Sequence, residues 1–144
     1  MIITQNTDGM HQRAGSQAVL ELHGSLWRLR CAKHGRSVDL AAAAYAQRAC
    51  PVCHKPLRPD ITWFGDGVDE TVFAHAQELI EAAELFVAVG CSGVVWPAAG
   101  LLRAARGRRV ELNLEDTDVS ALFEERVREK AGTALPRLFK APAL

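Results

Sequence analysis

Three cysteines and one histidine, arranged as two close pairs, constrain the fold of this chain more than any other feature. Two residues separate Cys31 from His34 and Cys50 from Cys53, and 15 residues lie between the pairs. Tetrahedral zinc suits such an arrangement, because each pair places two ligands on one side of the ion. We therefore predict a zinc site with the ligands Cys31, His34, Cys50 and Cys53. His54 is an alternative fourth ligand, although its position next to Cys53 is geometrically awkward.

The region around these ligands, residues 31–59, differs in composition from its surroundings and is predicted to be an inserted zinc-binding module. It contains an alanine-rich stretch, residues 40–47, that we expect to be helical. A site with four protein ligands is closed, so its zinc is structural rather than catalytic. No secretory signal is visible at the N-terminus, and cysteines at this spacing then favour metal over disulfides and a cytoplasmic location. Cys91 lies far from the other cysteines and is expected to be a small buried side chain.

Outside the module, strand and helix patterns alternate. Apolar residues at helical spacing predict a helix over 71–83, and a continuous apolar run predicts a strand over 85–89, buried on both faces. The other predicted elements are strands over 1–4, 26–29 and 110–114 and helices over 9–14, 97–106 and 120–130, the last with Ser120 as N-cap. This order predicts an α/β fold in which residues 1–30 and 60–144 form a partial Rossmann-like parallel sheet, with the zinc-ribbon module inserted.

Polar or glycine-rich segments follow three of the predicted strands, at residues 5–8, 90–93 and 113–115. In open α/β sheets, ligands bind at the carboxyl ends of the strands. We therefore expect these three segments to line one shared ligand pocket.

Charge and hydropathy exclude two classes of partner. Basic and acidic residues number 17 each, so the net charge is zero, and a zinc-ribbon nucleic-acid binder would usually carry a basic excess. The cluster of Arg103, Arg106, Arg108 and Arg109 is expected to be a solvated helix end rather than a phosphate-binding track. The uncharged stretch 85–102 is broken by glycines and a proline, whereas a membrane-spanning helix needs about 20 mostly apolar residues. We expect neither nucleic acid nor membrane as a partner.

Several motifs, in order along the chain, resemble the sirtuin family of NAD-dependent protein lysine deacylases. Residues 4–16 resemble the family's TQNIDGLHQRAGS, and residues 21–24 match its ELHG. Residues 58–66 are similar to its RPxxVWFGE, residues 90–92 to its GTS, and residues 113–115 to its second ribose-binding segment. Independent motifs in the same order are far more specific than a single glycine pattern.

The resemblance implies a reaction and a set of site residues. NAD would be a co-substrate, nicotinamide would be released, and the acyl group would pass from a lysine of a protein or peptide to ADP-ribose. His23 would be the general base, a role that suits an imidazole because its pKa lies near neutral pH. The residues implied to contact NAD are Gln5, Asn6, Thr7, Asp8, Gly90, Cys91, Ser92, Asn113, Leu114, Glu115 and Ala131. The residues implied to pair with the acyl-lysine peptide by strand addition are Ile61, Thr62, Trp63, Phe64 and Gly65.

The sequence departs from the family pattern in four places. His34 stands where the family has a cysteine, Cys91 where it has a threonine, and Thr7 where it has an isoleucine. The glycine-rich segment GAGxSxxSGIPxFR, which cradles the pyrophosphate in the family, does not occur in these 144 residues. We therefore expect this chain alone to bind NAD poorly and to show little deacylase activity. The alternative is a non-catalytic, zinc-stabilised interaction module derived from a sirtuin.

Overall fold

A computed structural model describes residues 1–39 and 48–139 of the chain. The helix expected over 40–47 lies outside the described residues. The chain divides into two compact units, Met1–Ala74 and His75–Leu144, and each has its own sheet architecture.

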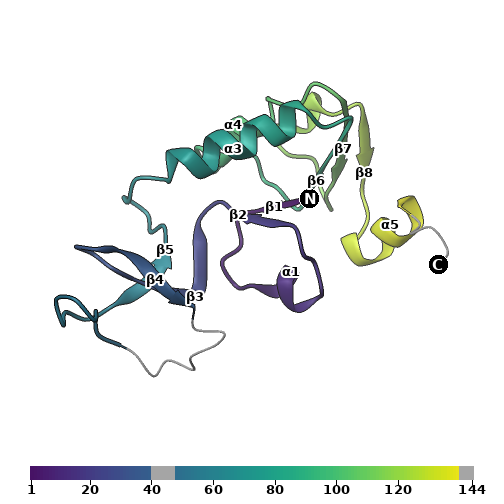
Figure 1. Ribbon diagram of the computed structural model, residues 1–144. Helices are drawn as coiled ribbons and strands as arrows, with labels where there is room; N and C mark the ends of the chain where they lie inside the picture. Colours follow the sequence, from purple (N-terminus) through teal and green to yellow (C-terminus); the bar gives the residue numbers. More distant parts are fainter. Residues whose placement is uncertain (40–47, 140–144) are drawn as a thin grey trace. The chain divides into compact units, whose positions relative to one another are not determined.

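The first unit begins with two short parallel strands. Strand β1 (Ile2–Thr4) pairs with β2 (Val19–Glu21), and helix α1 (Met10–Arg13) lies in the connection between them (Figure 1). The predictions of a strand over 1–4 and a short helix over 9–14 are confirmed. Gly9 precedes the helix with φ +69°, and a Cβ at this position would lie 2.8 Å from the Trp27 ring. The turn into α1 therefore requires a residue without a side chain.

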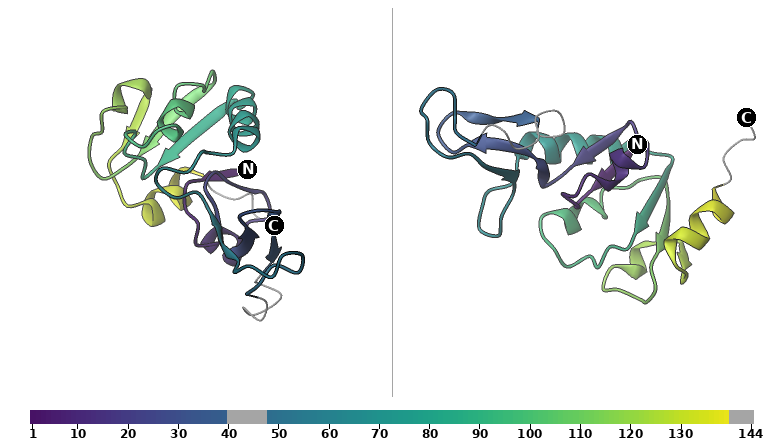
Figure 2. Two further views of the ribbon diagram at one scale, coloured as in Figure 1. Left: turned by 90° about the vertical axis from the view of Figure 1, so that its left-hand side faces the viewer. Right: turned by 90° about the horizontal axis from the view of Figure 1, so that it is seen from below.

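The rest of the first unit is an antiparallel sheet with the order β4-β3-β5, formed by β3 (Gly24–Cys31), β4 (Gly35–Asp39) and β5 (Arg58–Ile61) (Figure 2). Strand β3 is longer than the predicted 26–29 and leads directly into the first zinc ligand. Gly24 has φ +76°, and a Cβ there would lie 2.0 Å from the carbonyl oxygen of Asp60. The close approach of β3 to β5 therefore depends on glycine at this position.

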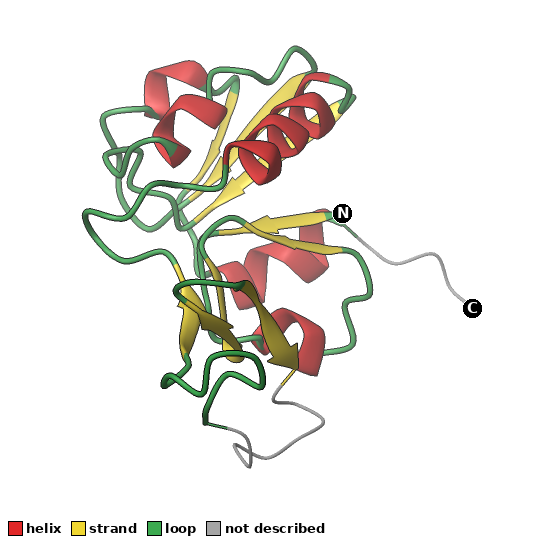
Figure 3. Ribbon diagram, turned by 60° about the vertical axis from the view of Figure 1, so that its left-hand side comes forward, coloured by secondary structure: helices red, strands yellow, loops and turns green. Residues whose placement is uncertain are grey.

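The second unit contains a parallel three-stranded sheet with the order β6-β7-β8 (Figure 3). The strands are β6 (Leu85–Val89), β7 (Arg108–Leu112) and β8 (Glu125–Val127). The helices are α4 (Ala98–Leu101), the 3-10 helix η1 (Ser120–Leu122) and α5 (Ala131–Leu138), and α3 (Glu70–Glu81) spans the boundary between the units. Ala88, Leu102, Val119 and Phe123 form a buried apolar cluster. The predicted α/β fold with a parallel sheet is confirmed.

The helix predicted over 120–130 is wrong. Only Ser120–Leu122 is helical, and the chain then enters β8, where Glu125 pairs with Val110 and Val127 with Leu112. Parallel pairing with β7 outweighs the helical spacing of the apolar residues. The Ser120 hydroxyl caps no α-helix; it donates a hydrogen bond to the Glu111 carboxylate at 2.7 Å.

The prediction that β6 is buried on both faces is also wrong. Leu85 and Val89 are 41% and 40% exposed, and Ala88 is the buried residue of this strand. Among the described residues β6 pairs only with β7, at one end of the sheet order. An uninterrupted apolar run therefore occurs here in an edge strand.

The helix predicted over 97–106 ends at Leu101, and turns follow it. The amide groups of Arg103 and Ala104 donate to carbonyls only three residues back, at 3.1 Å each, which tightens the chain into turns. Arg108 and Arg109 belong to β7 and form ion pairs with Glu125 and Glu124, so they are not part of a helix end. In the described part of the chain, no helix combines the length and apolar character needed to cross a membrane.

Candidate functional site

His23, the predicted general base, lies in the turn between β2 and β3. Its backbone carbonyl accepts a hydrogen bond from Thr62 at 2.9 Å, and its ring lies 6.0 Å from the Phe73 ring, centroid to centroid. Burial lowers the pKa of His23, so the neutral imidazole predominates at neutral pH. The Nδ1 atom is buried and has no hydrogen-bond partner among the described residues. A neutral imidazole keeps a nitrogen lone pair, which a general base requires.

The loop at residues 5–8 is fixed mainly through its backbone. Leu26 donates to the carbonyl of Thr7 at 2.9 Å, and the indole Nε1 of Trp27 donates to the carbonyl of Asp8 at 2.7 Å. The Asp8 carboxylate accepts the amide of Met10 at 3.0 Å at the start of α1. Gln5 and Asn6 are exposed. The start of β3 therefore holds the predicted nicotinamide-binding loop while two polar side chains remain accessible.

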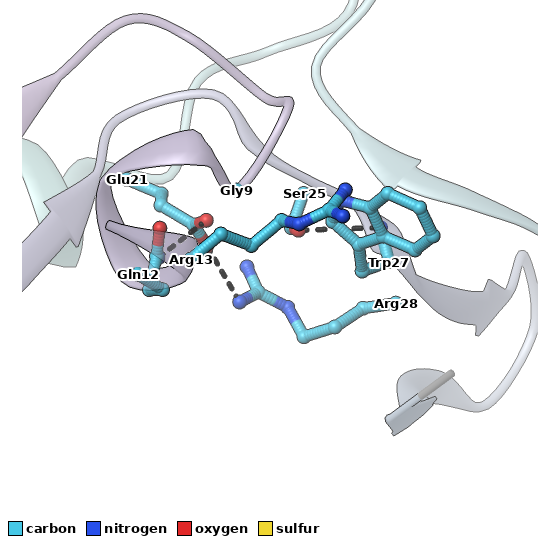
Figure 4. Close-up of a pocket in the computed structure, with 7 residues that line it drawn as sticks. All are labelled: Gly9, Gln12, Arg13, Glu21, Ser25, Trp27 and Arg28. Atoms are coloured by element: carbon cyan, nitrogen blue, oxygen red, sulfur yellow. Dashed lines mark hydrogen bonds and ion pairs between the residues drawn. The ribbon is translucent and has the colours of Figure 1, made fainter. Parts of the chain in front are cut away.

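A cavity of about 530 Å³ lies beside this loop and was not anticipated from the sequence (Figure 4). Glu21 is hydrogen-bonded to Gln12 at 2.9 Å and ion-paired with Arg28 at 2.7 Å within it. The lining residues are Gly9, Gln12, Arg13, Glu21, Ser25, Trp27 and Arg28. Trp27 connects the cavity with the loop, because its side chain lines the cavity and its indole nitrogen donates a hydrogen bond to the Asp8 carbonyl.

The second unit brings together two of the three predicted strand-end segments. Gly90 donates to the carbonyl of Leu112 at 2.9 Å, and the Asn113 side chain donates to the carbonyl of Cys91 at 3.0 Å. Gly90 has φ +63°, and nothing would contact a Cβ there, so its backbone is open to a ligand. The third segment, residues 5–8, belongs to the first unit. Ala131 begins α5.

Cys91 is half-buried and packs against the apolar cluster of the second unit. Burial raises the pKa of its thiol, and the sulfur lies 3.6 Å from the carbonyl oxygen of Val89. Cys91 is therefore a neutral thiol at neutral pH. Ser92, Leu114 and Glu115 are exposed on the same segments.

The four predicted zinc ligands meet in one cluster. The Cys31 sulfur lies 3.6 Å from the Cys53 sulfur and 3.6 Å from His34 Nδ1, and His34 Nδ1 lies 3.4 Å from the Cys50 sulfur. Tetrahedral zinc with ordinary bond lengths separates two sulfurs by about 3.8 Å and a sulfur from a nitrogen by about 3.6 Å. The Cys₃His geometry therefore fits zinc, and His34 rather than His54 completes the cluster.

The local backbone also suits metal binding, which requires thiolates. Amide groups of Cys53 and Val52 lower the pKa of Cys50 to about 7. Amide groups of His34 and Lys33 likewise lower the pKa of Cys31. Both ligand pairs thus lie in turns whose N–H groups stabilise negative sulfur.

The segment predicted to bind peptide, residues 61–65, starts at the end of β5 and continues into a turn. Asp66 donates its amide to the carbonyl of Trp63 at 2.9 Å, and Gly65 has φ +92° at the third position of this turn. Phe64, at the second position, is 103% exposed. Thr62 is already bonded to the His23 carbonyl. The turn therefore presents two aromatic side chains, Trp63 and Phe64, to solvent.

The comparisons with known proteins agree with these features. The sequence model of the Sir2 family matches residues 1–97. NAD-dependent protein deacylase 2 of Pyrobaculum aerophilum is 42% identical over 143 residues, covering 95% of this chain and 57% of that protein. The NAD-dependent protein deacylase of Aquifex aeolicus is 38% identical, covering 96% of this chain and 60% of that protein.

Solved structures give the same result. A Sir2 homologue in complex with NAD superimposes with a TM-score of 0.84 at 34% identity, covering 94% of this chain and 55% of that one. A Sir2 complex with a p53 peptide and NAD+ gives 0.78 at 29% identity, covering 96% and 61%. The chain spans a little more than half the length of these relatives. By its sequence and its fold, the chain belongs to the Sir2 family.

Proposed function

We propose that this chain provides the catalytic histidine, the zinc module and part of the NAD site of an NAD-dependent protein lysine deacylase. The observation that carries the proposal is His23, a neutral, half-buried imidazole at the family's ELHG motif. The names of the curated relatives, which are NAD-dependent protein deacylases, support the same activity.

In this proposal NAD supplies the ADP-ribose that receives the acyl group, and nicotinamide is released. His23 accepts a proton from a ribose hydroxyl at a ring nitrogen. Asn6 and Asp8, with Gln5 and Thr7, hold the nicotinamide end by hydrogen bonds, which an amide and a carboxylate can provide in both directions. The open backbone at Gly90 supports close approach of the other end of the dinucleotide.

The remaining proposed contacts come from both units. Cys91, Ser92, Asn113, Leu114, Glu115 and Ala131 contact the adenosine half of NAD. The backbone of residues 61–65 pairs with an acyl-lysine peptide as an added strand. The position of this segment beside the proposed base supports the assignment: Ile61 pairs with Gly24 in the β3–β5 ladder, and the Thr62 amide donates to the His23 carbonyl.

Zinc has a structural role in this proposal, and the module over 31–59 folds around it. Its thiolates must remain reduced, which favours a cytoplasmic location. Because the 144 residues cover 57–60% of the first two relatives, we further propose that this chain alone has reduced NAD affinity and activity.

The test compares wild type with His23→Ala in the full gene product, using an acetyl-lysine peptide and NAD. We expect a loss of turnover of at least about 100-fold with unchanged thermal stability, the usual scale of general-base removal. His75→Ala is the matched control, because His75 is an exposed histidine on α3. Turnover retained in His23→Ala contradicts the assignment of the base. A stable, zinc-loaded wild type without NAD-dependent turnover favours the alternative, a zinc-stabilised interaction module.

A further inference from the structure

A buried carboxylate in the second unit has no role in the proposed chemistry. Glu111, in β7, is 1% exposed. It accepts hydrogen bonds from Thr117 Oγ1 at 2.9 Å, Ser120 Oγ at 2.7 Å and Arg128 Nη2 at 2.6 Å. Arg128 also pairs with Asp116. These five residues are called the Glu111 network below.

The network keeps Glu111 ionised although it is buried. Burial alone would raise the pKa of this carboxyl, but the hydrogen bonds from Ser120, Arg128 and Thr117 more than offset it and lower the pKa. The hydroxyls also bond to each other and to the loop backbone, since Ser120 Oγ accepts the amide of Thr117 at 2.8 Å. The Glu111 carboxylate and the two hydroxyls therefore hold the loop from Thr117 to Ser120 in one conformation.

The network residues flank or adjoin in sequence two of the segments proposed to bind the adenosine half of NAD, residues 113–115 and the start of α5. Residues 113–115 lie between two of its members, Glu111 and Asp116, and Ala131 follows Arg128 by three positions. Asn113 makes two hydrogen bonds to neighbouring segments. Its backbone amide donates to the Val127 carbonyl at 3.1 Å, and its side chain donates to the Cys91 carbonyl at 3.0 Å. Movement of Arg128 relative to Glu111 would thus shift residues 113–115 and, through the Asn113 side chain, the Cys91 carbonyl.

Stability alone does not account for this ion pair. Two charges lose most of their hydration on burial, and well-packed apolar residues of similar volume often serve equally well or better. The distinctive effect of this pair is geometric. The Glu111 carboxylate accepts hydrogen bonds from Thr117, Ser120 and Arg128, which a methionine or leucine in its place could not do.

We propose that Glu111 and Arg128 are positioning residues for the adenosine half of the dinucleotide. Their network holds residues 113–115 and the start of α5 in the geometry that binds a nucleoside diphosphate sugar. This inference rests on the proposed function, and neither residue is assigned a contact with the reacting atoms.

The test uses ADP-ribose binding to the full gene product, measured by titration calorimetry, in wild type and in the double variant Glu111→Met/Arg128→Leu. We expect the dissociation constant for ADP-ribose to rise about tenfold or more, which corresponds to about 1.4 kcal/mol. Some loss of stability is expected because Ser120 and Thr117 lose their acceptor, so binding is measured at a temperature at which both proteins are folded. In turnover, KM for NAD should rise while KM for the peptide and kcat at saturating NAD stay within about twofold of wild type.

The matched control is Glu81→Met/Arg106→Leu, which removes a surface ion pair of the same unit. It should leave ADP-ribose binding unchanged. Ser120→Ala provides a second variant that keeps both charges; we expect a rise of about threefold in the dissociation constant and faster amide exchange over 113–117, in line with one lost hydrogen bond. This variant remains informative if the double variant does not fold.

The outcomes separate the two proposals. If wild type does not bind ADP-ribose, the proposed function itself is wrong. If wild type binds and both Glu111→Met/Arg128→Leu and Ser120→Ala bind equally well, the positioning role is wrong and the network is structural. A rise in the peptide KM equal to that for NAD would also contradict the proposal, because it would indicate a general loss of structure.

Discussion

The zinc-ligand cluster and the Glu111 network organise their parts of the chain in different ways. The zinc ligands come as two local pairs, each separated by two residues, and the metal connects turns that already aim their sulfur atoms at one point. The Glu111 network instead joins residues with no regular spacing, from β7, the loop after it, η1 and the position after β8. The first arrangement is visible in the sequence, whereas the second appears only once β7 and β8 are paired. A metal-centred cluster should therefore fail completely when one ligand is lost, and a hydrogen-bonded network should fail gradually.

The largest effect is expected when a zinc ligand is removed. Cys50→Ser should abolish zinc binding and unfold the antiparallel sheet, because such sites contribute on the order of 10 kcal/mol to local folding. Zinc content by mass spectrometry under native conditions and amide exchange over β3 and β5 measure this. The control is His54→Ala, which changes a histidine adjacent to Cys53 that lies outside the cluster. Equal zinc loss in His54→Ala would show that the ligand set is wrong.

The next largest effect concerns Gly24, which allows β3 to approach β5 closely. Gly24→Ala should destabilise the first unit by about 3 kcal/mol or more, because it forces a positive φ and a clash with the Asp60 carbonyl. Gly67→Ala is the matched control, since a Cβ there meets nothing within 4 Å. Chemical denaturation of zinc-loaded protein gives both values. A small loss in Gly24→Ala would mean that the metal, and not the β3–β5 contact, determines this sheet.

The same contrast explains which features the sequence predicts. Each zinc-ligand pair, the helix around 71–83 and the strand 85–89 are local patterns, so the sequence predicts them directly. The segment 120–130 has apolar residues Leu122, Phe123 and Val127 at helical spacing, yet Val127 lies opposite Leu112 in the sheet. Local pattern could not reveal this pairing, nor the need for Gly24 opposite Asp60. The strand pattern predicts residues 5–8, 90–93 and 113–115 as ligand-binding segments, and the family motifs assign them to NAD.

Acid should affect the Glu111 network in a defined direction. The pKa of Glu111 is lowered in the folded protein, so its contribution to stability is present above the ordinary carboxyl pKa and is lost as the pH falls towards the folded value. Glu124, whose pKa is lowered to about 2 mainly by Arg109, acts in the same sense at the surface. We expect stability of the second unit to decline below pH ~4.5, and Glu111→Gln to flatten part of this decline. Amide exchange over β7 and β8 at pH 4, 5 and 6 follows the second unit separately from the zinc site, whose ligands release the metal in acid; an unchanged slope in Glu111→Gln would show that the carboxyl is not ionised in the network.

The smallest effect is expected when one hydrogen bond of the 5–8 loop is removed, the bond from the Trp27 indole to the Asp8 carbonyl. Trp27→Phe keeps a ring beside Gly9 and removes the indole N–H that donates to the Asp8 carbonyl. We expect a loss of about 1 kcal/mol in stability, the usual contribution of one such bond, and faster exchange of the Met10 amide at the start of α1. Trp63→Phe is the matched control, since Trp63 is exposed and its indole has no role in the loop. Trp27 donates one hydrogen bond to the 5–8 loop, whereas Glu111 accepts three from residues that follow the 113–115 segment, so loosening should be smaller in Trp27→Phe than in Glu111→Gln. If amide exchange rises as much or more in Trp27→Phe as in Glu111→Gln, the number of hydrogen bonds does not determine how firmly these segments are held.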